Sequence, residues 1–390
     1  MPVSTQAHQR VLPLLLGGLL LAALGLPFLT QAPNRLVTGT GLLLAEVAQG
    51  RRALVLAPLL LWLLALARPA SARSTRLLIA LGAAGTIAGL TWLAGSHAAA
   101  LVSDDLPLGR TSLGGGYWVL IVLCGLAASE AARGPDVPRL WPPAVGLLLL
   151  GPLATLLLQG GLDQLSLMKE YDNRQDVFDA ALQRHLLLVA ATLLATLLIA
   201  VPTGVLISRR ATLAAPLLAL LNLVQTVPSI ALFALLMGPL AALSARWPLL
   251  AQWGISGIGP APAIIALTLY SLLPMVRSIS AGLGQVAPTV IESARGMGMS
   301  ELQIFRQVEL PLALPVWLAG LRVTTVQAIG LAVVAALIGA GGFGAVMFQG
   351  LLSSALDLVL LGVLPVVGLS VLADSLFKLI AGLLSAHRTP

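Results

Sequence analysis

The pattern in this chain that comes nearest to a chemical site is the glycine run GAGGFG at residues 339–344. It fits G-x-G-x-x-G, and Asp357 lies 18 residues beyond the first glycine, near the spacing of the ribose-binding acid in dinucleotide folds. The setting disagrees, because the preceding apolar run is about 27 residues long, whereas the fingerprint follows a short strand. The run instead predicts close helix packing, or a helix end that unwinds near a gate, at Gly339, Gly341, Gly342 and Gly344.

Other residue patterns with known chemistry are missing from the sequence. G-x4-G-K-[ST] does not occur, since the two lysines, Lys169 and Lys378, follow Met and Phe, so any ATP must bind to another chain. The four histidines and the single cysteine contain neither HExxH nor a paired-Cys set, which argues against a metal site. Cys124 lies in an apolar run and is expected to be a packing residue. We therefore expect no catalytic residue and no cofactor in this chain.

Composition predicts a polytopic membrane protein. Hydrophobic residues make up 58% of the chain and charged residues 9%, with a mean hydropathy of +0.97. The net charge of +7 could suggest nucleic acid, but the 22 Lys and Arg are scattered among loops without a basic stripe or interleaved aromatics. The expected surroundings are therefore membrane lipid, and no nucleic-acid partner is predicted.

Apolar runs predict an all-α bundle of about ten spans. Two of them are short for a hydrocarbon core of about 30 Å, and the last run contains Pro365, where it could break. The first run follows Arg10 and imitates a signal peptide, but it is long for one, so a retained helix is favoured. The predicted spans are residues 11–29, 53–67, 77–95, 117–132, 140–158, 186–207, 217–241, 262–281, 312–338 and 357–383.

Polar groups inside these spans are the candidates for a translocation path, because such groups are costly in a bilayer and mark functional sites. Pro228 should bend its helix and free backbone carbonyls, while Gln225 and Ser229 would share one helix face. Tyr270, with Ser271 and Pro274, predicts a similar break in the next span. Arg322 lies about two turns into a span, where it either lines the path or snorkels to the cytoplasmic interface. The candidate path residues are Asn222, Gln225, Thr226, Pro228, Ser229, Tyr270, Arg322 and Gln327. Asp374 and Lys378 are spaced to form an i,i+4 pair.

A polar stretch at residues 292–311, ESARGMGMSELQIFRQVELP, separates two long spans. Glu292 is expected at a helix start, where the macrodipole favours a carboxylate, and Gly298 can end that helix with a positive φ. Ser300 and Gln303 form a capping-box pattern for a second helix, and Pro311 marks the return to the membrane. Two short helices with a small apolar face, either Leu302, Phe305 and Val308 or Ile304 and Val308, would make a knob for a partner's groove. The alternative is an ordinary amphipathic loop.

Basic residues predict the orientation. With the N-terminus inside, cytoplasmic segments hold twelve Lys and Arg against eight in the outside segments. This places residues 292–311 and both termini in the cytoplasm. We expect three regions: five N-terminal spans within residues 1–158, a charged external connector at 159–185, and five further spans within 186–390.

The register of the polar stretch resembles a known motif. Glu292-Ser293-Ala294, three residues, Gly298, nine residues and Val308-Glu309-Leu310-Pro311 resemble the "EAA" loop of ABC importer permeases, E-A-A-x3-G-x9-I-x-L-P, with Ser for Ala and Val for Ile. Residues 221–235, 266–283, 308–315 and 335–344 resemble the osmoprotectant branch of that family, over roughly 186–380. The stretch 166–178 and the extra N-terminal helices look like the long permease of an uptake system that has two different permeases. Nothing in residues 1–158 resembles the core module.

The resemblance implies an inner-membrane subunit that imports glycine betaine or related quaternary amines. Its partners would be a cytoplasmic ABC ATPase dimer that binds ATP, a second permease (homologous or identical) and a periplasmic solute-binding protein. Aromatic residues are only 4% of the chain, so selection by cation–π contacts is expected in the binding protein. The alternatives are an ion-coupled secondary transporter, although most acids lie in loops, and a membrane scaffold without transport. The implied coupling residues are Glu292, Ser293, Ala294, Gly298, Val308, Leu310 and Pro311.

Overall fold

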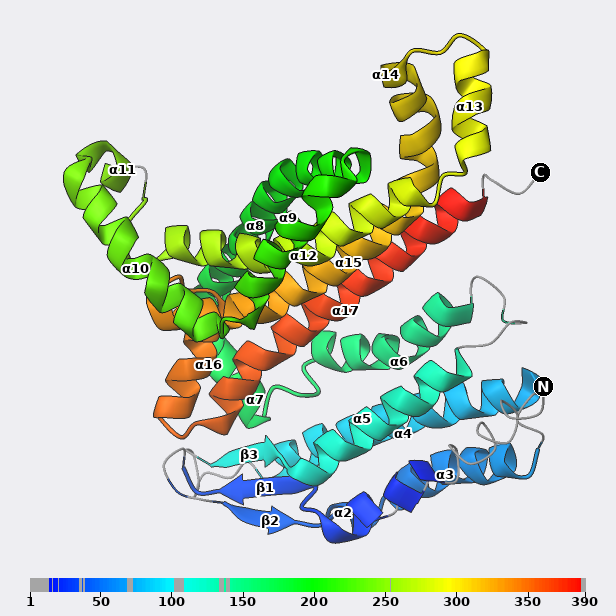
Figure 1. The fold of residues 1–390 in the computed structure, drawn as a ribbon. Coiled ribbons are helices and arrows are strands. Elements are labelled where there is room, and N and C mark those ends of the chain that lie inside the picture. The colour runs from blue at the N-terminus through cyan, green and yellow to red at the C-terminus, as the bar shows by residue number, and fades with distance from the viewer. Residues whose placement is uncertain are drawn as a thin grey trace. The chain divides into compact units, whose positions relative to one another are not determined.

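A computed structural model describes residues 14–386, apart from residues 16, 20, 35, 36, 38, 69–72, 102–108, 133–136, 138–140 and 253. The chain divides into two compact units, Met1–Asn173 and Arg174–Pro390. Helices dominate both units (Figure 1). Because the predicted connector 159–185 spans the division, its residues are shared between the end of the first unit and the start of a long helix in the second.

The first unit contains a small antiparallel sheet beside its helices. Strand β1 lies in the middle, with β2 on one side and β3 on the other. This sheet departs from the all-helical prediction, because strands of three or four residues are too short to show an alternating pattern. The elements are β1 Leu29–Ala32, β2 Thr40–Leu42, α2 Leu44–Val47, α3 Ala53–Leu66, α4 Arg73–Ala100, β3 Arg110–Leu113, α5 Gly115–Ala131, α6 Trp141–Leu158 and α7 Ser166–Asp172.

Helix α4 is the centre of the first unit and packs against α3, α5 and α6. Its small residues allow close approach: a Cβ atom at Gly95 would lie 2.1 Å from the Gly161 carbonyl oxygen. Two polar contacts, one partly buried and one buried, fix its neighbours. The Trp62 indole donates to the Thr86 hydroxyl at 3.2 Å, and the Thr91 and Tyr117 hydroxyls lie 2.9 Å apart. These contacts satisfy polar groups that would otherwise be buried without partners.

The second unit is entirely helical in its described residues. Helices α8, α12 and α15 pack together, and buried Ala200, Val276, Ile279 and Ala313 form the centre of their contact. The elements are α8 Gln175–Arg209, α9 Ala211–Thr226, α10 Ser229–Arg246, α11 Pro248–Gln252, α12 Pro260–Gly284, α13 Pro288–Gly296, α14 Glu301–Ile304, the π-helix η1 Phe305–Glu309, α15 Leu310–Val334, the 3-10 helix η2 Ala335–Ile338, α16 Phe343–Leu352 and α17 Leu356–Ala386.

Six helices among the described residues are long and apolar enough to cross a membrane. The predicted spans 53–67, 117–132 and 140–158 coincide with shorter apolar helices, and 11–29 lies partly outside the described residues. The predicted span 217–241 is two helices, whereas the expected breaks at Pro274 and Pro365 are absent because α12 and α17 run through them. The six candidate spans are Arg73–Ala100, Gln175–Arg209, Ser229–Arg246, Pro260–Gly284, Glu301–Ile338 and Leu356–Leu383.

Candidate coupling arm and translocation residues

Helices α13 and α14 form a protruding arm, residues 288–304, that extends beyond the ends of α12 and α15 (Figure 1). Helix α13 begins at Pro288, after extended Ala287. Glu292 is therefore the fifth residue of this helix, and its expected place at the helix start was wrong. The reason is local, since proline at the first position presets a helical φ and starts the helix one turn earlier.

The end of α13 has the geometry that the sequence predicted. Gly298 has a φ of +83°, the left-handed conformation that glycine adopts at low cost. The Gly298 amide donates to the Arg295 carbonyl at 3.0 Å, and the Met299 amide donates to the Ala294 carbonyl at 3.2 Å. These two bonds make a Schellman motif, which ends the helix and reverses the chain.

The second helix of the arm is capped as the sequence predicted. The Ser300 amide donates to the Gln303 side-chain oxygen at 2.8 Å, and the Gln303 amide donates to the Ser300 hydroxyl at 3.4 Å. Arg295 joins the two helices through bonds of 2.7 and 3.0 Å to one carboxylate oxygen of Glu301. Both side chains are exposed, so this pair contributes little stability compared with the two caps.

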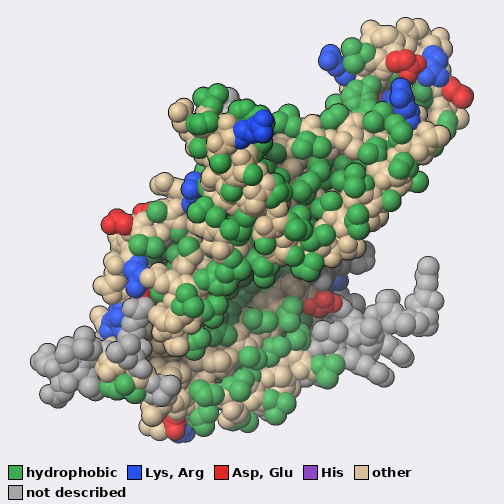
Figure 2. Space-filling model, turned by 60° about the vertical axis from the view of Figure 1, so that its left-hand side comes forward, with side chains coloured by type: hydrophobic (Ala, Val, Ile, Leu, Met, Phe, Trp, Pro, Cys, Tyr) green, Lys and Arg blue, Asp and Glu red, His purple; other side chains and the backbone are tan. Residues whose placement is uncertain are grey.

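The apolar side chains of the arm divide into an inner and an outer set. Ala294 and Ile304 are buried, with Phe305 partly buried beside the core of the second unit. Met297 is 75% exposed and Leu302 is 58% exposed, so both lie on the outside of the arm. The first predicted face is thus divided, since Leu302 is exposed and Phe305 is partly buried, whereas in the second face Ile304 is buried and Val308 is partly buried. Figure 2 shows charged side chains near the arm's tip and a largely apolar surface on the helices below it.

The arm continues into a membrane-spanning helix through a π-helical segment. Residues 305–309 form the π turn, in which the Leu310 amide donates to the Phe305 carbonyl, and Pro311 lies in the first turn of α15. Pro311 has no N–H, and its ring would clash with the carbonyl of Gln307 in a regular α-helix. The wider turn accommodates the proline without ending the helix, a feature often found at functional sites.

An ion pair joins the π segment to α8. Arg209, at the end of α8, donates to the Glu309 carboxylate, which is only 2% exposed, whereas Arg209 is 45% exposed. The partners are 100 residues apart in sequence, and no local pattern predicted their meeting. The pair gives the base of the arm a second attachment besides the helix itself.

The predicted bend at Pro228 is a complete break. Helix α9 ends at Thr226, Val227 and Pro228 are extended, and α10 begins at Ser229. Gln225 and Ser229 therefore lie on different helices, so the expectation that they share one face was wrong. The Thr226 hydroxyl donates back to the Leu223 carbonyl at 2.7 Å.

Helix α12 reaches across to this break. The Gln225 amide nitrogen donates to the Tyr270 carbonyl at 2.9 Å, and the Tyr270 hydroxyl donates to the Val227 carbonyl. Tyr270 thus satisfies a carbonyl that the break frees. Nearby, Arg277 donates to the Asn222 side-chain oxygen at 3.0 Å. The structure brings these candidates from α9 and α12 together.

Arg322 belongs to a separate network between α15 and α17. It donates to Asp374, which also pairs with Lys378 at 2.7 Å, so the predicted i,i+4 pair is confirmed and extended. Gln327 lies further along α15 and is partly buried. Three charges from two helices therefore meet at Asp374, so the arginine does not stand alone.

The glycine run forms a tight turn between η2 and α16. Gly339, Gly341 and Gly342 all have positive φ values, between 75° and 81°. Arg184 donates to the Ala340 carbonyl at 3.1 Å, which ties the turn to the first part of α8. A Cβ atom at Gly344 would lie 2.0 Å from the Val333 carbonyl oxygen, so this position requires glycine. Helices flank the turn on both sides, unlike a strand-to-helix phosphate loop.

Within the described ranges, His, Cys, Asp and Glu side chains form no group of three that could hold a metal ion. Buried His185 instead lies 3.1 Å from the Ile329 carbonyl through Nε2, and it packs on the ring of Phe343. The arrangement offers a docking arm, a broken helix and polar groups between spans. Such parts suit a transport subunit.

Comparisons with known proteins match both units of the chain. Residues 8–168 match the family described as the N-terminal domain of the ABC transporter permease YehY. Residues 197–385 match the family described as the binding-protein-dependent transport system inner membrane component. The second match includes the arm, the break at Pro228 and the glycine turn.

Curated relatives match about half of the chain. The osmoprotectant import permease protein OsmW of Salmonella typhimurium is 41% identical over 191 residues, covering 49% of this chain and 84% of the relative. The osmoprotectant import permease protein OsmY of that organism is 38% identical, covering 53% and 81%. The glycine betaine/carnitine/choline transport system permease protein OpuCD of Bacillus subtilis is 35% identical, covering 49% and 77%.

Proposed function

Because the chain belongs to the family of binding-protein-dependent transport system inner membrane components, we propose that it carries small osmoprotectants into the cell. It is a multi-pass membrane protein and the permease subunit of an ABC importer. Glycine betaine and related quaternary amines are the proposed substrates, since the relatives' names include osmoprotectants, glycine betaine, carnitine and choline. ATP hydrolysis is proposed to occur on a separate ATPase subunit.

The geometry of the arm at residues 288–304 is the main support for this proposal. Its turn is fixed by the backbone at Gly298 and by the Ser300 cap, while its base is attached to α8 through Glu309. Exposed Met297 and Leu302 offer an apolar surface that a groove in the ATPase can cover. Coupling is assigned to Glu292 and Ser293 on the exposed side of α13, to buried Ala294 and Gly298 in its turn, and to Val308, Leu310 and Pro311 in the transition to α15.

The continuous helix suggests how the arm acts. Residues 301–338 run from α14 through the π turn into α15 and η2, so a displacement of the arm would pass directly into a membrane span. The bond from Arg209 to Glu309 would pass the same movement to α8. Closure of the ATPase would in this way shift the helices that line the path.

The path is proposed to run beside the break between α9 and α10. Gln225, Tyr270 and Asn222 supply oxygen and nitrogen groups there, and a partly exposed charged network lies at Arg322. Because these polar groups already form hydrogen bonds with one another, they can bind a cation only weakly. Weak binding suits a translocation path, from which the substrate must be released. Thr226, Pro228, Ser229 and Gln327 are the remaining proposed path residues, and the glycine turn at 339–344 is proposed as a gate or close-packing point.

The proposed assembly contains an ATPase dimer in the cytoplasm, an external solute-binding protein and a second permease. Two relatives from one organism, OsmW and OsmY, carry the same description, which supports a partner that is homologous to this chain. The arm and both chain termini are proposed to lie in the cytoplasm. The first unit is proposed to be an additional membrane region joined to the importer core.

Uptake by the reconstituted assembly tests the proposal. The complete complex is placed in proteoliposomes with labelled glycine betaine outside, and with either ATP inside or an ion gradient alone. Uptake that requires internal ATP and the binding protein is the expected result. Uptake driven by the gradient alone would contradict it and favour a secondary transporter.

A further inference from the structure

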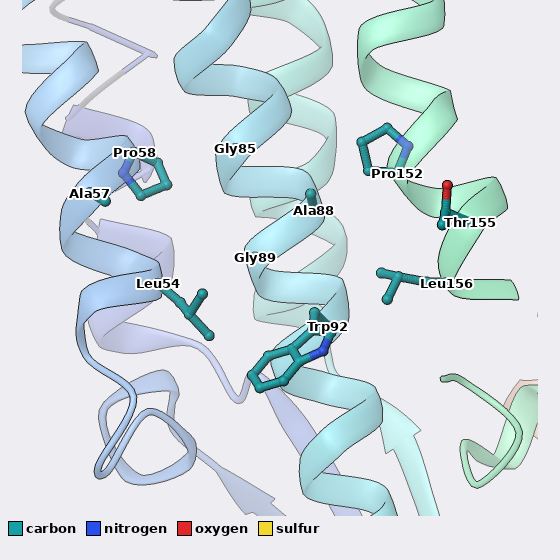
Figure 3. Close-up of a pocket in the computed structure, with 10 residues that line it drawn as sticks. All are labelled: Leu54, Ala57, Pro58, Gly85, Ala88, Gly89, Trp92, Pro152, Thr155 and Leu156. Atoms are coloured by element: carbon teal, nitrogen blue, oxygen red, sulfur yellow. The ribbon is translucent and has the colours of Figure 1, made fainter. Parts of the chain in front are cut away.

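The first unit has an open groove between α3, α4 and α6, with a volume of about 510 Å³ (Figure 3). This volume falls within the range of about 300–1,000 Å³ that is common for small-molecule sites. Residues of α4 form its floor, α3 and α6 form its walls, and the lining is apolar except for Thr155. The lining residues are Leu54, Ala57, Pro58, Gly85, Ala88, Gly89, Trp92, Pro152, Thr155 and Leu156.

The sequence explains why a groove forms here. Gly85, Ala88 and Gly89 lie on one face of α4 at helical spacing, so the floor has almost no side chains. Trp92 follows one turn later on the same face and closes one end of the groove, where Leu54 and Leu156 also lie (Figure 3). The groove is therefore long, smooth and bounded at one end by an aromatic ring.

The surroundings of the groove are apolar. Leu56 and Leu60 of α3, together with Leu147 and Leu150 of α6, have exposed side chains on the outside of these helices. In a membrane protein, lipid hydrocarbon is what covers such surfaces. An acyl chain is accordingly the occupant that matches the lining of the groove.

A fixed positive charge lies at the closed end. The Arg51 guanidinium carbon lies 4.9 Å from the centre of the Trp92 ring, and Arg51 also donates to the Ser96 hydroxyl at 2.6 Å. These two contacts hold an exposed guanidinium beside the ring, with more N–H donors than the serine uses. A planar guanidinium suits bidentate binding of a phosphate. Exposed Arg52 adds a second positive charge next to it.

From the apolar groove and the charge at its end, we propose that this site binds an anionic phospholipid. One acyl chain lies along the floor that α4 forms, between Pro58 of α3 and Trp92 of α4, and the phosphate binds Arg51. A headgroup without a compensating cation is favoured, because two arginines are adjacent at residues 51 and 52. The site belongs to the N-terminal unit, outside the parts assigned to transport.

Photolabelling of the full chain tests the proposal. The complete complex, in nanodiscs, is exposed to phosphatidylglycerol or phosphatidylcholine that carries a photoreactive group on the acyl chain, and labelled peptides are mapped. Labelling of α3, α4 and α6 is expected to be about tenfold stronger with phosphatidylglycerol, because both lipids offer a phosphate but only phosphatidylcholine adds a cation that the arginines repel; tenfold corresponds to about 1.4 kcal/mol. Arg51→Gln should reduce it to the phosphatidylcholine level, while the neighbouring Arg52→Gln keeps most of the preference.

A second pair of variants distinguishes the contribution of the groove to lipid binding from the contribution of the charge. Ala88→Leu fills the floor and should abolish labelling by both lipids, whereas Ala144→Leu, on the exposed side of α6, should leave labelling unchanged. Unchanged thermal stability of the variants shows that they fold. Equal labelling by the two lipids in the native chain would overturn the proposal and indicate ordinary boundary lipid. Absence of labelling would also overturn it and indicate that protein fills the groove.

Discussion

Replacing Gly298 should uncouple transport from ATP hydrolysis while leaving membrane insertion intact. The residue has a φ of +83°, and a Cβ atom there would meet no atom within 4 Å, so backbone strain is the main effect of a side chain. The left-handed conformation costs an ordinary L-residue roughly 1–2 kcal/mol, and a β-branched residue is a clear outlier there. A penalty of that size lowers the population of the correctly shaped arm by a factor of about 5–30.

Gly296 provides a matched control two residues away. A Cβ atom there also meets nothing within 4 Å, but the residue is the last of α13 and has no positive φ. Valine at this position adds the same bulk to the arm without the left-handed strain, and glycine is itself unfavourable in a helix by about 1 kcal/mol. Gly296→Val should therefore transport nearly as well as the native chain.

The assay measures uptake and substrate-stimulated ATP hydrolysis in proteoliposomes, with the amount of inserted protein measured in parallel. Gly298→Val is expected to lose uptake by about the same factor of 5–30 or more, at an unchanged amount of inserted protein. Normal uptake and normal stimulated hydrolysis in this variant would refute the coupling role. Equal losses in both glycine variants would show that bulk on the arm matters, and not the backbone conformation.

Three further outcomes are expected. Arg209→Gln should lower thermal stability more than Glu309→Gln, by about 1–3 kcal/mol, because it leaves a buried carboxylate unpaired; equal losses would contradict this. Leucine at Gln225 should slow uptake without changing the affinity of the binding protein, and a normal rate would leave only a structural bond of about 0.6 kcal/mol there. In a chain whose Cys124 has been replaced, an impermeant thiol reagent applied to intact cells should label the variant Asp172→Cys but not Arg295→Cys. The opposite pattern would show that the predicted topology is inverted.

The arm was predictable because its signals are local. A Schellman turn needs a glycine at one position, and a capping box needs two residues three apart, so Gly298, Ser300 and Gln303 suffice to place both helix ends. The start of α13 was misplaced because Glu292 received more weight than Pro288. A proline that presets the backbone determines a helix start more strongly than a carboxylate that favours it by a fraction of a kcal/mol.

Whether a proline breaks its helix could not be predicted from the local sequence. Helix α12 runs through Pro274, whereas the chain breaks completely at Pro228. The difference lies in packing, since many residues of α12 are buried against α8 and α15, including Met275 and Val276 beside its proline, while α9 contains no buried residue. Tertiary contacts hold α12 straight despite a lost hydrogen bond, and they act over distances that a sequence window does not cover.

The long-range contacts and the small sheet lay beyond any sequence pattern. The bond from Arg209 to Glu309 and the bond from Tyr270 to Val227 join residues that are 100 and 43 positions apart. Each charge or hydroxyl alone is compatible with many places in a bundle, and only the packed helices bring its partner near. The same holds for the short strands β1 and β3, in which Leu29 pairs with Leu113.

The base of the arm combines a flexible element with a rigid one. A π turn at residues 305–309 has wider hydrogen-bonded rings than an α-helix, so the connection between the arm and α15 can bend here. The buried Glu309 lies in the same turn, and its bond to Arg209 limits that bending to movements in which α8 takes part. Arg322, 13 residues beyond Glu309 on α15, binds Asp374 and so engages α17. Under the proposed coupling role, a displacement of the arm would be distributed over three spans, α8, α15 and α17.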